Sequence, residues 1–138
     1  MIHTSSSVEE TTALARELAE LQPDRDAYYL VGDLGAGKTH FTKGLAAHYG
    51  IRTEVVVSPT FSLVNRYSGG SRVVCHIDLY RIEHERELDE LGIEEMEEEG
   101  ALLVVEWAEK LGARRRPSAT VVDFEVTGET TRRIRIDE

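Results

Sequence analysis

Residues 32–39, Gly-Asp-Leu-Gly-Ala-Gly-Lys-Thr, match the phosphate-binding pattern G-x-x-x-x-G-K-[ST] at every required position. Glycines in such a run let successive backbone N–H groups turn inward around a phosphate, and the lysine ammonium reaches the β- and γ-phosphate oxygens. The threonine hydroxyl is placed to bind Mg²⁺. The pattern predicts a nucleotide site formed by Asp33, Leu34, Gly35, Ala36, Gly37, Lys38 and Thr39.

Two acidic residues, Asp78 and Glu106, each end an apolar run further along the chain. Ligands of parallel sheets lie at the carboxyl ends of the strands, so both side chains are predicted to face the nucleotide. Phosphoryl-transfer sites of this kind use an acid to hold Mg²⁺ or to orient the attacking water. We predict that Thr39 and Glu106 bind the metal and that Asp78, Glu106 and Lys38 are catalytic. For the residue that orients the water, Asp78 and Glu106 remain alternatives.

Weaker signals surround this set of residues. Thr60, in a Ser-Pro-Thr turn, lies where many P-loop hydrolases place a threonine that senses the γ-phosphate. Trp107 directly follows Glu106, so a role beside the metal stands as the alternative to a core or interface position. We interpret His76 as a half-buried strand residue, because no second His or Cys has the spacing of a metal ligand. No guanine-specifying N-K-x-D motif is present, which favours adenine as the base.

Alternating helices and strands must position these residues. Apolar periodicity and turn residues predict helices over 6–21, opening with a capping box at 6–9, and over 38–49. They predict one or two short helices over 85–99, broken at Gly92, and strands over 27–31, 54–57, 61–67, 72–78 and 102–106, with a closing hairpin over 119–126 and 132–136. This order predicts one α/β domain over 1–138, a P-loop NTPase-like fold with a mixed, mostly parallel central sheet flanked by helices.

The net charge of −10 over 138 residues comes almost entirely from one block. Residues 83–99 hold ten acidic residues and one arginine, which we interpret as a solvated helical face, with a docking surface for a basic partner as the alternative. The only basic run, residues 114–116, is interpreted as a solvated loop. Charge outside the block is balanced and aromatic residues are scattered, so we expect the protein alone to bind nucleic acid only weakly.

Composition also predicts the compartment. The longest apolar run, 101–105, is far too short to cross a membrane. The first residues lack the basic and apolar regions of a secretion signal, and Cys75 is the only cysteine. We therefore expect a cytoplasmic protein that does not associate with membranes.

Four blocks in this order resemble the TsaE family of small P-loop ATPases of bacterial tRNA threonylcarbamoyladenosine synthesis. They are the P-loop at 32–39, Ser-Pro-Thr-Phe-Ser-Leu-Val at 58–64, His-Ile-Asp-Leu-Tyr-Arg at 76–81 and Val-Glu-Trp at 105–107. A further segment, Glu-Leu-Asp-Glu-Leu-Gly at 87–92, is similar to the family's E-L-x-x-[LM]-G. The resemblance covers nearly the whole chain.

The resemblance implies that the protein binds ATP or ADP with Mg²⁺ and hydrolyses ATP slowly when alone. It implies action with the TsaD–TsaB heterodimer, contact with tRNA only through that complex, and hydrolysis that resets the complex between turnovers. Thr39 and Glu106 match the family's magnesium positions, and Asp78 matches an acid required for hydrolysis. Thr60 matches the family's Ser-Pro-Thr loop, Trp107 the tryptophan beside the magnesium acid, and Arg132 a residue near the nucleotide.

Two other functions fit parts of the sequence. A small-molecule kinase also uses a P-loop of this size, but it needs an arginine-bearing lid where this chain has the acidic block. A nucleotide-gated binding module would use ATP to set its affinity for a partner without turnover.

Overall fold

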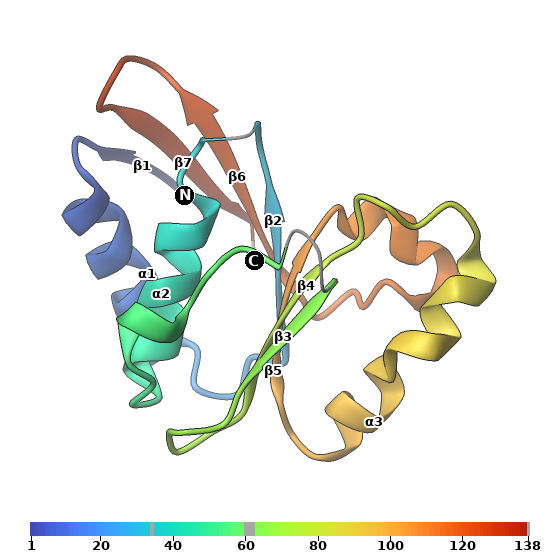
Figure 1. The fold of residues 1–138 in the computed structure, drawn as a ribbon. Helices are drawn as coiled ribbons and strands as arrows, with labels where there is room; N and C mark the ends of the chain where they lie inside the picture. The colour runs from blue at the N-terminus through green and yellow to red at the C-terminus, as the bar shows by residue number, and fades with distance from the viewer. Residues whose placement is uncertain (34, 60–62, 138) are drawn as a thin grey trace.

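One mixed sheet of seven strands runs through the middle of the described part of the molecule (Figure 1). The computed structural model describes residues 1–33, 35–59 and 63–137. The strands are β1 (Ile2–Ser5), β2 (Ala27–Val31), β3 (Val64–Tyr67), β4 (Val74–Asp78), β5 (Leu102–Glu106), β6 (Thr120–Val126) and β7 (Arg132–Asp137). The helices are α1 (Val8–Leu21), α2 (Lys38–His48) and α3 (Ile93–Glu98), with 3₁₀ segments η1 (Thr53–Val55), η2 (Glu85–Leu91) and η3 (Ala108–Arg114).

The strand order β1-β7-β6-β2-β5-β4-β3 brings the predicted site together. The four central strands, β6, β2, β5 and β4, are parallel, whereas β1, β7 and β3 pair antiparallel with their neighbours. This confirms the predicted α/β fold with a mixed sheet that is parallel at its centre. Strand β5 lies between β2 and β4, and the register pairs Glu106 with Leu30 on one side and Asp78 on the other.

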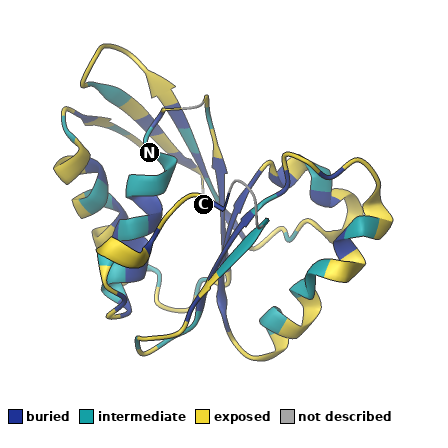
Figure 2. Ribbon diagram, viewed as in Figure 1, coloured by how far each residue is buried: buried dark blue, intermediate teal, exposed yellow. Residues whose placement is uncertain are grey.

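Strands β2, β4 and β5 are buried along most of their length because both faces of this part of the sheet are covered (Figure 2). On β2, Tyr28 and Leu30 point into the core under α1 and α2. The neighbouring Tyr29 points into the second core, which includes Leu88 of η2 and Leu111 of η3. Alternation along a buried strand thus supplies two cores, one on each side of the sheet.

Helices α1 and α2 pack closely against each other on one side of the sheet (Figure 1). A Cβ added to Gly44 would overlap the Thr12 carbonyl oxygen and lie 2.7 Å from the Ala15 Cβ. Only glycine therefore permits this separation of the two helices. The contact fixes α1 relative to α2, the helix that follows the P-loop.

The predicted strand over 54–57 is wrong. Residues 53–55 form one 3₁₀ turn, η1. In the segment that follows, the backbone of Val57 forms its hydrogen bonds with side chains and not with a neighbouring strand. The Tyr67 hydroxyl accepts from the Val57 N–H at 3.0 Å, and the Asn65 amide donates to the Val57 carbonyl at 3.1 Å. A short apolar run carries no sign of whether its backbone partners will be another strand or nearby side chains.

Other element boundaries also differ from the predictions. Strand β1 was not predicted, because an exposed edge strand of four residues has no apolar alternation. Helix α1 is capped by Ser7, whose hydroxyl accepts from the Glu10 N–H, so the cap lies one residue later than the predicted box. Strand β3 begins at Val64, and residues 61–62 of the predicted strand lie outside the described residues.

The acidic block forms η2 and α3, which are broken at Gly92 as predicted. Leu88 is buried on its inner side, and most of the acidic side chains are exposed. Arginines from elsewhere neutralise part of it: Arg66 pairs with Glu99, Arg114 with Asp89, and Arg116 with Glu97. The basic run at 114–116 therefore binds within the molecule and is not a free loop. No helix in the described part of the chain is long and apolar enough to cross a membrane.

Candidate nucleotide site

The P-loop connects β2 to α2. Gly37 is the N-cap of α2 and has a φ of 105°, in the left-handed region that favours glycine. Helix α2 begins at Lys38, so its first unpaired backbone N–H groups and the positive end of its dipole face the loop, where they favour an anion. Ala36 is buried and its N–H donates to the Asp33 carbonyl at 3.1 Å, so it braces the turn instead of lining the site.

A cleft of about 1120 Å³ opens above the P-loop. Five parts of the chain line it: the start of α1, the P-loop and first turn of α2, Ser58 in the segment after η1, the ends of β4 and β5 with the residues that follow them, and the tip of the β6–β7 hairpin. The lining includes these predicted site residues: Asp33, Gly35, Gly37, Lys38, Thr39, Asp78, Glu106, Trp107 and Arg132. Leu34 and Thr60 lie outside the described residues.

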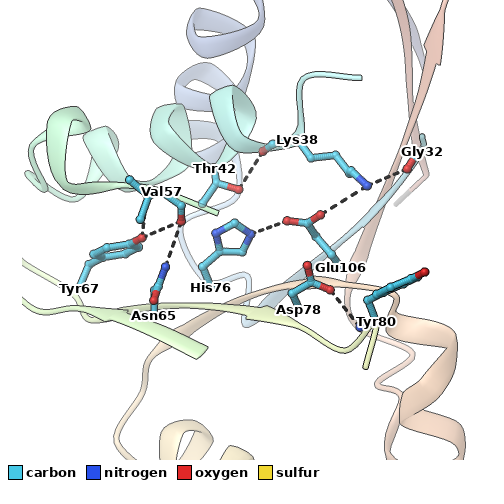
Figure 3. Close-up of polar contacts among 10 residues, drawn as sticks. All are labelled: Gly32, Lys38, Thr42, Val57, Asn65, Tyr67, His76, Asp78, Tyr80 and Glu106. Atoms are coloured by element: carbon cyan, nitrogen blue, oxygen red, sulfur yellow. Dashed lines mark hydrogen bonds and ion pairs between the residues drawn. The ribbon is translucent and has the colours of Figure 1, made fainter. Parts of the chain in front are cut away.

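A chain of polar contacts runs from the P-loop through Glu106 to β4 (Figure 3). The Lys38 ammonium donates to the Gly32 carbonyl at 2.7 Å and lies 3.4 Å from Glu106 Oε1. The other oxygen, Oε2, is 2.7 Å from Nε2 of His76. The Glu106 carboxylate thus joins a P-loop residue to a residue of β4. His76 is fully buried, so the expectation of a half-buried histidine is wrong.

Glu106 is only 6% exposed, yet its surroundings keep it ionised. Burial acts to raise its pKa, but the hydrogen bond with His76 and the neighbouring Lys38 ammonium outweigh it, so the pKa of Glu106 lies below its usual value. A carboxylate in this state accepts from donors on both sides, Lys38 and His76. The site therefore holds a fixed negative charge next to the phosphate-binding loop.

Asp78 ends β4 beside Glu106 but lies in a different environment. Its Oδ1 accepts from the Tyr80 N–H at 3.0 Å, which closes a turn directly after the strand (Figure 3). The side chain lines the cleft, and within the described residues it forms no ion pair. Asp78 is therefore closer to solvent than Glu106 and is not shared with Lys38.

Trp107 forms one wall of the cleft together with Tyr80. Trp107 has a φ of 62°, which directs its ring outward immediately after Glu106, and 40% of the residue is exposed. Its ring centroid is 5.1 Å from that of Tyr80, and the Lys110 ammonium lies over both rings. A left-handed conformation is strained for a non-glycine residue, which is common at binding sites.

Arg132 connects the β6–β7 hairpin to the P-loop. Its Nη2 donates to the Gly35 carbonyl at 3.1 Å, and its Nη1 donates to the Gly128 carbonyl at 3.0 Å in the hairpin tip. Glu129 and Thr130 of the same tip line the cleft. Arg132 thus fixes the position of the hairpin over the loop.

Sequence reasoning missed the contribution of α1. Ser6, Ser7, Val8, Glu9 and Thr11 line the cleft, although the capping motif indicated only that a helix begins there. The remaining unpredicted lining residues are His40, Ser58, Tyr80, Glu129 and Thr130. No local signal gives α1 this role, because it is the close packing of α1 on α2 that places the first turn of α1 at the cleft.

The oxygen donors of the cleft fit a magnesium ion. Among the described residues, no three His, Cys, Asp or Glu side chains lie close enough to hold a metal by themselves. Mg²⁺ is usually held by one or two protein oxygens together with waters and substrate phosphates. The Thr39 hydroxyl and the ionised Glu106 carboxylate, both in the same cleft, match that donor set.

Comparison with known proteins gives one consistent result. The family model of the threonylcarbamoyl adenosine biosynthesis protein TsaE matches residues 5–134. The TsaE proteins of Aquifex aeolicus and Bacillus subtilis are 38% identical over 131 residues and 45% identical over 100 residues. These alignments cover 94% and 72% of this chain, and 90% and 61% of the relatives.

A solved structure agrees with the sequence matches. The crystal structure of Bacillus subtilis YdiB superposes with a TM-score of 0.70 at 28% identity, covering 97% of this chain and 82% of the other. The family match spans the P-loop, both acidic strand ends and the start of the last strand, which are the parts that build the cleft. On this agreement of sequence and fold, the chain belongs to the TsaE family of threonylcarbamoyladenosine biosynthesis proteins.

Proposed function

We propose that this protein is the Mg²⁺-dependent ATPase of a tRNA threonylcarbamoyladenosine-synthesising complex in the cytoplasm. In this role it acts with the TsaD–TsaB heterodimer, and ATP hydrolysis resets the complex between turnovers. The observation that carries the proposal is the contact of Lys38 with Glu106 at the P-loop, in a cleft large enough for a nucleotide, with His76 bonded to Glu106 from behind. Family membership supports the tRNA modification pathway.

Phosphate binding would begin with an exchange of partners at Lys38. Without nucleotide, its ammonium is held by the Gly32 carbonyl and by Glu106. The β- and γ-phosphate oxygens replace these acceptors, while the first N–H groups of α2 and of the loop donate to the same phosphates. Positioning and charge neutralisation account for most of the catalysis expected from such a site.

The two acidic residues would divide the remaining work. Mg²⁺ would be held by the Thr39 hydroxyl and Glu106, and when bound it neutralises charge on the phosphates. Asp78, which lines the cleft and is not paired with Lys38, is the better placed of the two to accept a hydrogen bond from the attacking water. A loss of single-turnover hydrolysis in Asp78→Ala, with ATP affinity retained, is the expected result.

The remaining cleft walls would hold the nucleoside. The first turn of α1 and the hairpin tip supply hydroxyls and two carboxylates to the cleft lining, including Ser7, Glu9, Glu129 and Thr130. Trp107 and Arg132 would complete the nucleotide site on either side. We expect ATP or ADP to bind there, with adenine as the base.

The decisive experiment is an ATP hydrolysis assay with Mg²⁺, using the protein alone and then with purified TsaD–TsaB and tRNA. Slow basal turnover that rises with the partners and is lost in Glu106→Gln would support the proposal. ATP binding without hydrolysis under either condition would contradict it and would favour a nucleotide-gated binding module instead. Phosphorylation of a nucleoside or metabolite would favour a kinase. In the described cleft, however, Arg132 is the only arginine, and it is tied to the hairpin.

A further inference from the structure

His76 is a buried polar residue on an otherwise apolar strand. It lies on β4 between Cys75 and Ile77, and all three are fully buried. Its Nδ1 has no hydrogen-bond partner among the described residues. Burying an imidazole with one unsatisfied nitrogen costs stability that an apolar residue would not. The role of His76 therefore lies in the contact that its other nitrogen, Nε2, makes.

That nitrogen, Nε2, lies 2.7 Å from Glu106 Oε2. An ionised carboxylate can only accept, so Nε2 carries the proton and donates it. The bond occupies one oxygen of Glu106 and fixes the plane of the carboxylate. The other oxygen, Oε1, is left on the side of Lys38 and the cleft. Without His76, the flexible glutamate side chain would be free to turn both oxygens toward the Lys38 ammonium.

His76 does not line the cleft and is completely shielded from it, so it cannot touch the nucleotide. Its effect on the reaction must therefore pass through Glu106. Partners of this kind orient metal-binding side chains, and their loss typically costs 10–100-fold in metal affinity or activity.

We infer that His76 is a positioning residue, which holds Glu106 with one oxygen presented to the cation that accompanies the nucleotide. The inference rests on the proposed function, because it assumes that Glu106 binds Mg²⁺. Removing the hydrogen bond is expected to weaken the part of nucleotide binding that depends on Mg²⁺. Binding of nucleotide without metal, which uses the P-loop and Lys38, should change little.

The test is calorimetric titration with ADP, once with saturating Mg²⁺ and once with EDTA. His76→Leu removes the donor and keeps the site apolar, and His76→Asn is too short to reach Glu106. His76→Gln can place an amide N–H near the position of Nε2. We expect about a 10-fold or greater loss of the Mg²⁺-dependent gain in affinity in the Leu and Asn variants, with most of that gain retained in the Gln variant. Ile77→Val is the matched control, because it loses buried volume on the same strand but points into the other core.

The outcomes separate the inference from the proposed function. No Mg²⁺-dependent gain in the wild-type protein would overturn both. A gain in the wild type that persists unchanged in folded His76→Leu and His76→Asn would overturn the inference alone. An equal loss of the Mg²⁺-dependent gain in Ile77→Val would also overturn the inference, because it would show that a less stable β4 is enough to reduce the gain. In a Glu106→Gln background, the His76 substitutions should cause no further loss, and an additional loss of equal size would contradict action through Glu106.

Discussion

Substituting Gly44 by alanine tests whether the close contact of α1 with α2 is required for the fold. The added Cβ would overlap the Thr12 carbonyl oxygen and lie within 3.0 Å of its carbonyl carbon. These are backbone atoms in the middle of a helix, so no side chain can rotate to make room. The helices must move apart, and α1 carries the residues at the edge of the nucleotide cleft.

Two opposing effects determine the size of the change. Overpacking a well-packed contact costs about 1–3 kcal/mol, and a clash with backbone belongs at the upper end of that range. Alanine is favoured over glycine in a helix by about 1 kcal/mol. The expected net loss is about 2 kcal/mol in the free energy of unfolding. For a domain of this size, that corresponds to a fall of about 6–8 °C in melting temperature.

Urea denaturation followed by circular dichroism measures this difference. Gly69→Ala is the control, because a Cβ there would meet no atom within 4 Å. We expect Gly69→Ala to unfold within about 0.5 kcal/mol of the wild type. If Gly44→Ala were as stable as the wild type or more stable, helix propensity would outweigh the contact, and the inferred rigid placement of α1 would be wrong.

Three further predictions concern single side chains. Arg132→Ala should lower ADP affinity, measured by calorimetry, by about 3–10-fold, because a hydrogen bond of about 1 kcal/mol from the hairpin to Gly35 is lost. Burial raises the pKa of the Cys75 thiol, so thiol reagents should react with it only after unfolding. The same shift means that the thiol's contribution to stability is complete below the unfolded pKa and decreases as pH rises through about 9, which pH-dependent urea titrations would detect. Lys38→Met should destabilise the nucleotide-free protein by about 1–3 kcal/mol in urea denaturation, because it removes the ammonium partner of the buried Glu106. Combining it with Glu106→Gln should recover part of that loss.

The sequence was sufficient to predict the part of the site whose signals are local. The P-loop pattern places phosphate-binding groups between a strand and a helix, and an apolar run ending in an acid identifies β4 and β5. Each of these two signals is contained in a short run of consecutive residues. The carboxyl ends of parallel strands then meet at one edge, so Asp78 and Glu106 had to lie near Lys38.

Other features depend on contacts between distant segments, and the sequence did not predict them. The bond between His76 and Glu106 joins residues 30 positions apart, and it turns an apparently ordinary strand histidine into part of the site. The cleft wall from α1 depends on helix packing, and its sequence signal describes only a cap. The segment after α2 looked like a strand because its valines are apolar, but its backbone partners are the side chains of Asn65 and Tyr67.

The order of the strands explains why the two acids differ although their sequence contexts are alike. Strand β5 lies between β2 and β4, so a carboxylate at its end is reached by the P-loop lysine from one side and by the β4 histidine from the other. Strand β4 lies one step further from the P-loop, and its terminal Asp78 bonds with its own turn. Glu106 is therefore held from two sides, which supports the proposal that it holds a cation in one place. Within the described residues Asp78 keeps an oxygen beyond that turn contact, which supports the proposal that it orients the attacking water.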